Sequence, residues 1–322
     1  MSVLSELPRE VVAPEALPAA LLGAGIVPPQ PEQMARRDAL FRETLSERMQ
    51  RVVLGTVWSL KPRRIDRLLP LARLAVLHLL EPDDALPDLT KTPGAGELVG
   101  IADDLSVATL AEAYAKGLFP HCHFGPTKWL SPPERCVLFF DDYHLSKRIR
   151  RIMRQGLYTV TFDRDFEGVI KACAGKREGH WHLTWITPRI MRAYAALFDA
   201  GLAHSVEVWN RDGELVGGGY GIAIGRVYFG ESLFSHEDNT SKLGGAVLNW
   251  HLAKWGYVLN DSKWATANHL NVGYRMIPRG EFLRILGEAA GEGGKPGRWT
   301  VEASPEVIAS WKPGHPDTGK AA

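Results

Sequence analysis

The feature that constrains the fold most is a run of three apolar segments in the middle of the chain. The segments cover residues 203–209, 214–224 and 226–234, and Asp212-Gly213 and Gly225 separate them. Apolar runs joined by such tight-turn signals are typical of antiparallel strands in a meander. The sequence therefore predicts a sheet at the centre of the protein.

The second of these segments contains four glycines, at positions 217, 218, 219 and 221. A glycine within a strand leaves a gap above the sheet. These positions therefore predict the close approach of another backbone or of a flat ligand, and not a phosphate-binding loop.

Helical and extended segments alternate around the predicted meander. Capping and periodicity signals predict helices at 106–116, 165–174, 188–200 and 241–254 and strands at 158–162 and 256–260. This mixture predicts the α/β class, with a mixed central sheet flanked by helices.

Composition divides the chain into four parts. Residues 1–95 are expected to form a Pro/Ala-rich tail followed by a basic helical extension, and the Pro- and Gly-rich stretch 81–100 is expected to be a linker. Residues 96–150 are expected to form a small N-terminal α/β domain, 151–300 the main domain and 301–322 a C-terminal tail.

The helical extension is locally basic. Between Glu32 and Leu80 there are ten Lys or Arg residues (Arg63, Arg64 and Arg67 among them) and five Asp or Glu residues, so the segment carries a charge of +5. It either contacts RNA phosphate or a membrane surface, or has a solvated basic side while Leu68, Leu71 and Leu74 pack inward. We favour the second interpretation, because solvated charged faces are common.

Bulk properties predict a globular protein in the cytoplasm without a membrane partner. Apolar residues make up 45% of the 322, which excludes intrinsic disorder, and no apolar run reaches the ~20 residues of a membrane span. The net charge of +1 means that RNA binding must rest on local patches. The three cysteines lack CxxC spacing, and no secretory signal precedes them.

Common catalytic signatures are missing, including the GxSxG elbow, the Walker loop, HExxH and a GxGxxG that opens a helix. Two His-containing triplets, 121–123 and 180–182, offer metal ligands, but neither has the spacing of a structural zinc site. We therefore expect no metal and no cofactor.

A basic cluster between residues 147 and 154 is the best candidate for phosphate contact. It consists of Lys147, Arg148, Arg150, Arg151 and Arg154. On a helix, 147, 150, 151 and 154 share one face. Because the acids that usually alternate with such a face are absent, tRNA binding is favoured over a solvated surface.

Two acidic residues, Glu231 and Asp261, are candidates for a catalytic site. Glu231 lies in a strand beside aromatic residues, where a carboxylate needs a partner, so it is either a structural ion-pair member or a site residue. Asp261 follows an apolar strand and is either a turn residue or a second site residue. If the two strands are neighbours, both acids would face one cleft.

Several sequence blocks together resemble the leucyl/phenylalanyl-tRNA–protein transferases, from about Gly100 to Leu286. The blocks are Asp104-Leu105-Ser106, Ala113-Tyr114-Ala115-Lys116-Gly117-Leu118-Phe119-Pro120, Trp129-Leu130-Ser131-Pro132-Pro133-Glu134-Arg135-Cys136-Val137-Leu138, His144-Leu145-Ser146-Lys147, Trp185-Ile186-Thr187, Ala203-His204-Ser205-Val206-Glu207-Val208-Trp209, Leu215-Val216-Gly217-Gly218-Gly219-Tyr220-Gly221, Gly230-Glu231-Ser232-Leu233-Phe234-Ser235 and Ile277-Pro278-Arg279. Their order along the chain is that of the family.

The resemblance implies a monomeric aminoacyltransferase whose GNAT-like domain spans residues 151–300. Its reaction would move Leu or Phe, with Met as a further candidate, from aminoacyl-tRNA to the free N-terminus of proteins that begin with Arg or Lys, marking them for degradation. No nucleophile is needed, because the tRNA ester is already activated and holding the amine near it can supply ~7–11 kcal/mol.

The resemblance also implies site residues. Trp129 and Trp185 would line the pocket for the aminoacyl-adenosine end, and Glu231 and Asp261 would form an acidic catalytic pair, with Asp261 as the proton acceptor. The predicted substrate-binding set is completed by Ser232, Phe234, Gly218, Gly219 and Tyr220.

The chain departs from the family two residues after Asp261, where Lys263 replaces the usual Gln. A cation there is expected to neutralise Asp261, disfavour basic acceptors and favour acidic ones, so Lys263 joins the predicted catalytic residues. Leu130 also replaces the second residue of an expected Trp pair, and residues 1–95 exceed the usual family length.

Two other functions remain open. One is a GNAT-type N-acyltransferase that uses acyl-CoA; the segment 235–240 argues against it, because it has no glycine and carries two acids where a pyrophosphate would bind. The other is a catalytically silent RNA- or peptide-binding homologue in which Lys263 has disabled the site.

Overall fold

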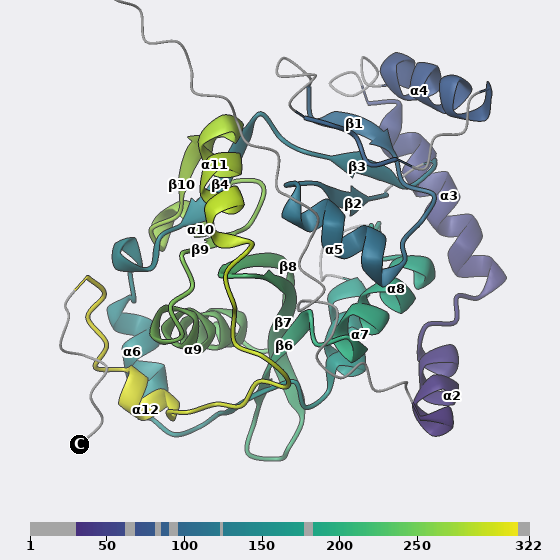
Figure 1. Cartoon of the computed structure of the whole chain (residues 1–322). Helices are drawn as coiled ribbons and strands as arrows, with labels where there is room; N and C mark the ends of the chain where they lie inside the picture. Colours follow the sequence, from purple (N-terminus) through teal and green to yellow (C-terminus); the bar gives the residue numbers. More distant parts are fainter. Residues whose placement is uncertain are drawn as a thin grey trace, which may run out of the picture.

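The computed structural model describes residues 30–61, 68–80, 85–89, 96–122, 125–176 and 183–314, which form two sheets surrounded by helices (Figure 1). The strands are β1 (Leu98–Ile101), β2 (Phe119–His121), β3 (Lys128–Leu130), β4 (Glu134–Leu138), β5 (Thr159–Phe162), β6 (Ala203–Trp209), β7 (Leu215–Ile224), β8 (Val227–Ser235), β9 (Leu259–Asp261) and β10 (Arg275–Pro278). The helices are α2 (Pro31–Leu40), α3 (Leu45–Ser59), α4 (Leu68–Leu80), α5 (Val107–Ala115), α6 (Lys147–Arg154), α7 (Phe166–Ala174), α8 (Pro188–Asp199), α9 (Thr240–Lys254), α10 (Ala267–Asn271), α11 (Arg279–Ala289) and α12 (Pro305–Ile308), with a 3-10 turn η2 (Phe140–Asp142).

The smaller sheet has three strands in the order β1-β3-β2, and the larger has seven in the order β10-β4-β9-β8-β7-β6-β5. Helices α7 and α8 lie to one side of the large sheet and α9 to the other (Figure 1). The predicted mixed α/β class is confirmed.

The predicted meander is also confirmed, since β6, β7 and β8 are consecutive antiparallel neighbours. Gly225 turns the chain between β7 and β8 with a φ of 54°. A Cβ at this position would collide with the carbonyl oxygens of Ala289 and Ala290, so only glycine fits between the turn and the end of α11.

Beyond the meander, α9 carries the chain across to β9, which pairs in parallel with β8. The strand predicted at 256–260 is shorter and later than expected. Residues 255–257 instead close the C-terminus of α9: Gly256 has a φ of 79°, and Tyr257 N–H donates to the carbonyl of Leu252 at 2.9 Å.

Two predicted boundaries are wrong. Strand β4 belongs to the large sheet, so the division at residue 150 does not separate the two sheets, and β1 begins inside the predicted linker. The C-terminal segment is not a free tail as far as the structure describes it, because Ile308 and Trp311 are buried in the core. The rest of that tail, from residue 315, lies outside the described residues.

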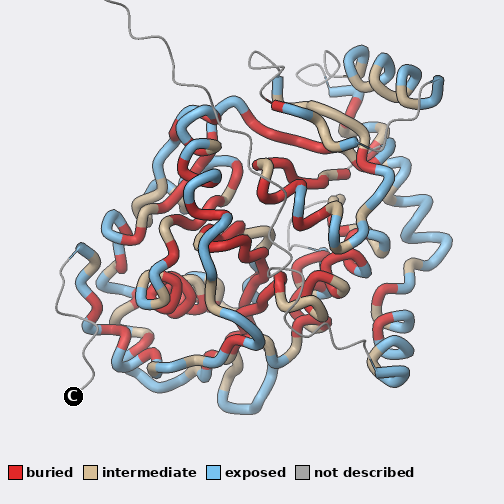
Figure 2. The backbone as a smooth tube through the Cα atoms, in the orientation of Figure 1, coloured by how far each residue is buried: buried red, intermediate tan, exposed pale blue. Residues whose placement is uncertain are grey.

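The large sheet separates two hydrophobic clusters. One includes Leu110, Ile190 and Phe282, contributed by α5, α8 and α11, and the other includes Leu243 and Trp299. Buried segments accordingly concentrate around the sheet in Figure 2. Strand β8 contributes Phe229 to the first cluster and Tyr228 to the second. Packing on both faces of the sheet therefore fixes the part of β8 that leads to Glu231.

The predicted helical extension is confirmed by α2, α3 and α4, whereas the proposed tail, residues 1–29, lies outside the described residues. Within the described part of the chain, no helix combines the length and the apolar character needed to cross a bilayer. Phe41, just after α2, is fully buried in the core.

A buried arginine attaches α2 to the main domain. Arg37 donates from Nε to Glu167 at 2.9 Å and from its two Nη atoms to Asp199 at 2.5 and 2.7 Å, and all three side chains are at most 9% exposed. Burial acts to raise the pKa of Glu167, but hydrogen bonds from Gln33, its own backbone and Arg37 lower it below its ordinary value.

We predict that Arg37→Ala lowers the free energy of unfolding by about 3–5 kcal/mol, because it leaves two buried carboxylates without a counter-charge. Urea unfolding followed by tryptophan fluorescence measures the change. The matched control is Arg36→Ala, which removes the exposed Arg36–Asp165 pair and should cost less than about 1 kcal/mol. Equal effects of the two substitutions would contradict the role of Arg37 in attaching α2 to the main domain.

Candidate active site

Strands β8 and β9 bring the predicted acids to neighbouring positions. The parallel pairing places Phe229 opposite Asp261, which is the last residue of β9, and Glu231 follows Phe229 by two residues. The expectation that Glu231 and Asp261 lie on adjacent strands is therefore confirmed. The two carboxylates nevertheless have different surroundings.

Asp261 is fully enclosed by an ion pair with Arg135 of β4. Arg135 donates from Nε to Oδ1 at 3.2 Å and from Nη2 to Oδ2, and both side chains are 0% exposed. The guanidinium also donates to the carbonyl of Gly117 at 2.8 Å and lies against the rings of Phe119 and Phe282. The prediction that Asp261 faces an open cleft is wrong, because Arg135 occupies that side of the carboxylate.

Glu231 lies in a different network. Its Oε1 accepts hydrogen bonds from Lys263 Nζ and from the Tyr114 hydroxyl, the latter at 2.7 Å, and its Oε2 accepts from the Tyr194 hydroxyl at 3.4 Å. The side chains of Lys263 and Glu231 are 4% and 2% exposed. Lys263 Nζ also donates to the carbonyl of Gly230 at 2.8 Å. The departure from the family at position 263 thus supplies the counter-charge of Glu231.

The expectation that Lys263 neutralises Asp261 is wrong. Its backbone N–H, and not its ammonium, donates to Asp261 Oδ1 at 3.0 Å. Lys263 has a φ of 64°, a left-handed conformation that non-glycine residues rarely adopt. Its carbonyl accepts from Cys136 N–H at 3.1 Å, so backbone hydrogen bonds on both sides hold this turn. Asp261 therefore fixes the turn that directs the Lys263 side chain to Glu231.

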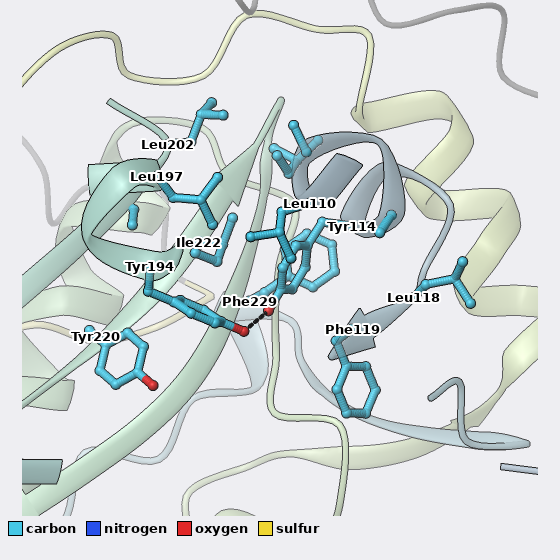
Figure 3. Packing of buried hydrophobic residues seen from close by; sticks show 14 of the residues in the cluster. Leu110, Tyr114, Leu118, Phe119, Tyr194, Leu197, Leu202, Tyr220, Ile222 and Phe229 are labelled. Carbon is cyan, nitrogen blue, oxygen red and sulfur yellow. Dashed lines mark hydrogen bonds between the residues drawn. The ribbon is translucent and has the colours of Figure 1, made fainter. Parts of the chain in front are cut away.

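Two tyrosines support Glu231 from helices α5 and α8. Their hydroxyls are 2.5 Å apart and point toward one another beside Phe229 (Figure 3). Burial, followed by the negative charge of Glu231, raises the pKa of both Tyr114 and Tyr194 well above the ordinary value. Both tyrosines are thus neutral hydrogen-bond donors over the ordinary pH range.

A partly exposed aromatic group adjoins this network. Trp185 stacks on His121, with ring centroids 5.4 Å apart, and meets Tyr194 edge-on at 6.2 Å. Trp264, 39% exposed, packs edge-on against His121, and its Nε1 donates to Glu97 at 2.6 Å. We call Trp185, His121 and Trp264 the aromatic platform.

Several predicted substrate-binding residues are less accessible than expected. Trp129 and Tyr220 are buried at 3% and 2% exposure, and Phe234 is also buried, whereas Ser232 is half-buried. A Cβ on Gly218 or Gly219 would collide with backbone atoms of β6 or β8. Close strand packing therefore explains these glycines, so the prediction that they bind substrate is not supported.

The predicted tRNA-binding cluster lies on α6. Lys147, Arg148, Arg151 and Arg154 are exposed. Arg150 instead donates to the carbonyls of Leu145 and Ala309, at 3.1 and 2.7 Å, and ties α6 to the segment after α12. Arg150 therefore has a structural role in addition to the phosphate contact that we predicted, which stays a prediction.

Three important residues were absent from the predicted site: Arg135, Tyr114 and Tyr194. Arg135 and Tyr114 stand within family-like blocks, which was the available signal, whereas Tyr194 lies in an ordinary helical pattern. Among the described residues no group of three or more His, Cys, Asp or Glu could hold a metal ion. The candidate ligands His123, His180 and His182 lie outside the described residues.

We predict that Asp261→Asn lowers the free energy of unfolding by about 3–5 kcal/mol, because it leaves the charge of Arg135 buried without a partner. Urea unfolding measures the change. Adding Arg135→Met should recover a large part of the loss, since no unpaired charge then remains. An Asp261→Asn protein within about 1 kcal/mol of the original would refute the structural role of this pair.

Comparison with known proteins agrees with the order of the blocks. The family model described as leucyl/phenylalanyl-tRNA protein transferase matches residues 137–287, and the model for the N-terminal domain of the same family matches residues 103–133. The N-terminal match ends just before β4 and the second begins within β4, the strand by which the chain passes from the small sheet to the large one.

Curated relatives carry the same description. A leucyl/phenylalanyl-tRNA–protein transferase of Azotobacter vinelandii is 49% identical over 190 residues, which cover 59% of this chain and 83% of the relative. One from Alkalilimnicola ehrlichii is 40% identical over 213 residues, covering 66% and 82%. Among solved structures, that of FemX has a TM-score of 0.36 at 11% identity and covers 70% of this chain and 74% of its own. On the strength of the family models and these relatives, the chain belongs to the leucyl/phenylalanyl-tRNA–protein transferase family.

Proposed function

We propose that this protein transfers leucine or phenylalanine from aminoacyl-tRNA to the N-terminal amine of acceptor proteins, in the cytoplasm, and so marks them for degradation. The observation that carries the proposal is the network around Glu231. In a chain of this family, it sets a carboxylate and a cation beside partly exposed aromatic rings. Such a site can hold an ester donor and transfer a proton during the reaction, so it needs no covalent nucleophile.

The reaction is a single acyl transfer. The neutral amine of the acceptor attacks the ester carbonyl carbon, a C–N bond forms, and the C–O bond to the terminal ribose breaks. We assign Glu231 the proton that the amine loses, which it returns to the departing ribose oxygen. This replaces the sequence-based assignment of Asp261 as acceptor, since Asp261 is 0% exposed and both of its oxygens accept from Arg135, whereas Glu231 Oε2 accepts one long hydrogen bond, from Tyr194 at 3.4 Å.

Lys263 has a separate task. Two of its three N–H donors are used on the Gly230 carbonyl and on Glu231, which leaves one for the oxyanion of the tetrahedral intermediate. Asp261 acts through Lys263, by holding its backbone in the left-handed conformation. In this scheme Asp261 is a positioning residue, whereas Glu231 and Lys263 contact the reacting atoms.

The aromatic platform suits the nucleoside end of the donor. Flat bases stack on Trp and His rings, and base stacking typically contributes ~1–3 kcal/mol. Trp185 and Trp264 are partly exposed, whereas Trp129 is buried. The exposed cations of α6, Lys147, Arg148, Arg151 and Arg154, would contact phosphates farther along the tRNA.

We further propose a GNAT-like arrangement for the large sheet. The support is the succession of antiparallel strands β5 to β8, the crossover through α9 and the parallel pair β8–β9. Acyl-CoA is disfavoured as donor, because Ser241 N–H at the start of α9 is already capped by Ser235 Oγ at 3.0 Å, and Glu237 and Asp238 precede the helix.

We predict that Glu231→Gln lowers kcat/KM for transfer by roughly 10²–10⁴-fold, because the amide cannot accept the proton. The assay mixes labelled Leu-, Phe-, Met- or Arg-tRNA with peptides that begin with Arg, Lys, Asp or Glu. Leu- and Phe-tRNA should be the best donors. Retained folding of the variant, measured by circular dichroism, is the control. Absence of transfer by the original protein for every pair would instead support a silent binding homologue.

Acceptor choice should depend on Lys263. Its ammonium cancels the charge of Glu231, which removes the attraction for a cationic first residue, so peptides that begin with Asp or Glu become acceptors. We predict that Lys263→Gln raises the kcat/KM ratio of Arg- over Asp-peptides by about tenfold, equivalent to about 1.4 kcal/mol. The double variant Lys263→Gln with Glu231→Gln is the control, because it has no charge left to select with. An unchanged ratio in Lys263→Gln would disprove this role.

A further inference from the structure

Exposed apolar side chains are concentrated in the N-terminal extension. Of 18 large hydrophobic residues that are exposed, 12 belong to residues 31–80, and the other six are spread over the remaining described chain. Large exposed apolar patches on soluble proteins mark interaction surfaces. The reaction proposed above uses no residue of this extension.

Helix α4 has an apolar face on both sides. Leu68, Leu71 and Leu74 are half-buried on the inner side, as the sequence predicted. The outer side carries Leu69, Val76, Leu77, Leu79 and Leu80, which are 50–79% exposed. The sequence interpretation expected a basic solvated side, but Arg73 is the one charged residue that interrupts this outer face. No residue of α4 is buried.

Helix α3 presents a second apolar face. Its exposed side chains recur every three or four residues, as on one side of a helix: Leu45, Met49, Val52, Val53, Val57 and the following Leu60. A capping box formed by Thr44 and Glu47 fixes the start of the helix. In Figure 1, α4 lies near the upper end of α3, and Figure 2 shows both helices as largely exposed.

The charges beside these faces are positive. Arg48 and Arg73 are exposed and form no ion pair within the described residues. The acids within and just before α3 are engaged locally: Glu43 accepts two hydrogen bonds from Arg51, at 2.8 and 2.9 Å, and Glu47 accepts from Thr44. Within the described residues, the two helices therefore set exposed arginines beside apolar side chains, while α4 contains no acid and the one acid of α3, Glu47, accepts hydrogen bonds from Thr44.

We propose that α3 and α4 bind an anionic phospholipid surface, with their outer leucines, valines and Met49 inserted at the boundary between headgroups and acyl chains. Apolar helical faces flanked by arginine are typical of helices that lie in this interface. Each apolar face lies on the outer side of a single helix, and a fluid lipid surface can adapt to that shape. This proposal departs from the sequence-based expectation of no membrane partner.

The test is sedimentation of the full chain with vesicles. One set contains phosphatidylcholine and phosphatidylglycerol in equal amounts, and the other contains phosphatidylcholine alone. We expect binding to the first set and at least tenfold weaker partitioning to the second. The triple variant Leu69→Gln, Leu77→Gln, Leu80→Gln should lose at least tenfold in partitioning to the anionic vesicles, because glutamine keeps helix propensity but not the apolar surface.

Two controls make the test decisive. Leu157→Gln with Val307→Gln removes exposed apolar side chains elsewhere and should leave vesicle binding unchanged. Arg48→Gln with Arg73→Gln keeps the apolar faces and should weaken binding to the anionic vesicles alone, which preserves the test if the triple variant fails to fold. Aminoacyl transfer without vesicles should be unchanged in every variant, so the outcome is independent of the proposed reaction.

Several results would overturn the proposal. One is that the original protein stays in solution with anionic vesicles, and another is that the triple or the arginine variant binds them as the original does. A third is that sedimentation equilibrium without lipid shows a dimer that the triple variant converts to a monomer, which would assign the apolar faces to a second copy of the chain.

Discussion

The buried ion pair of Arg135 and Asp261 is the interaction on which the rest of the site depends. It joins the neighbouring strands β4 and β9 of the large sheet, and the same carboxylate accepts the N–H of Lys263. Two charges this deeply buried are tolerated because each one satisfies the other and because Gly117, Phe119 and Phe282 complete the surroundings of the guanidinium. The position of the Lys263 side chain follows from this pair.

The position of the Lys263 side chain determines how the charges of the site are paired. Two anions and two cations are arranged as separate pairs, Asp261 with Arg135 and Glu231 with Lys263, so neither carboxylate is left as an uncompensated charge. In the proposed reaction, an acceptor would therefore meet a site whose charges balance. Tyr114 and Tyr194 contact Glu231 and one another, and Tyr194 meets Trp185 of the aromatic platform, so hydrogen bonds and ring contacts run from the ion pair to the platform.

The N-terminal extension combines a fixed and an open part. Arg37 and Phe41 attach it to the main domain through a buried ion pair and a buried ring. Beyond this attachment, α3 and α4 expose apolar side chains that the main domain does not cover. A firmly anchored helix that leads to an uncovered apolar surface can hold the main domain beside a lipid surface. The proposed lipid contact would therefore bring the reaction close to a membrane.

The sequence by itself determined the elements, including the meander of β6 to β8 and helices α5, α7 and α8, because turn glycines, capping side chains and apolar periodicity act over a few residues. It allowed the adjacency of Glu231 and Asp261, but the parallel pairing of β8 with β9 established it. Tertiary structure alone decided the boundary at β4, the pairing of Lys263 with Glu231 and the structural use of Arg150. These depend on residues far apart in sequence, such as Arg135 and Asp261, 126 positions apart. Sequence spacing carries no information on which cation reaches which buried anion, since that choice is made by packing geometry and by the cost of leaving a charge unpaired.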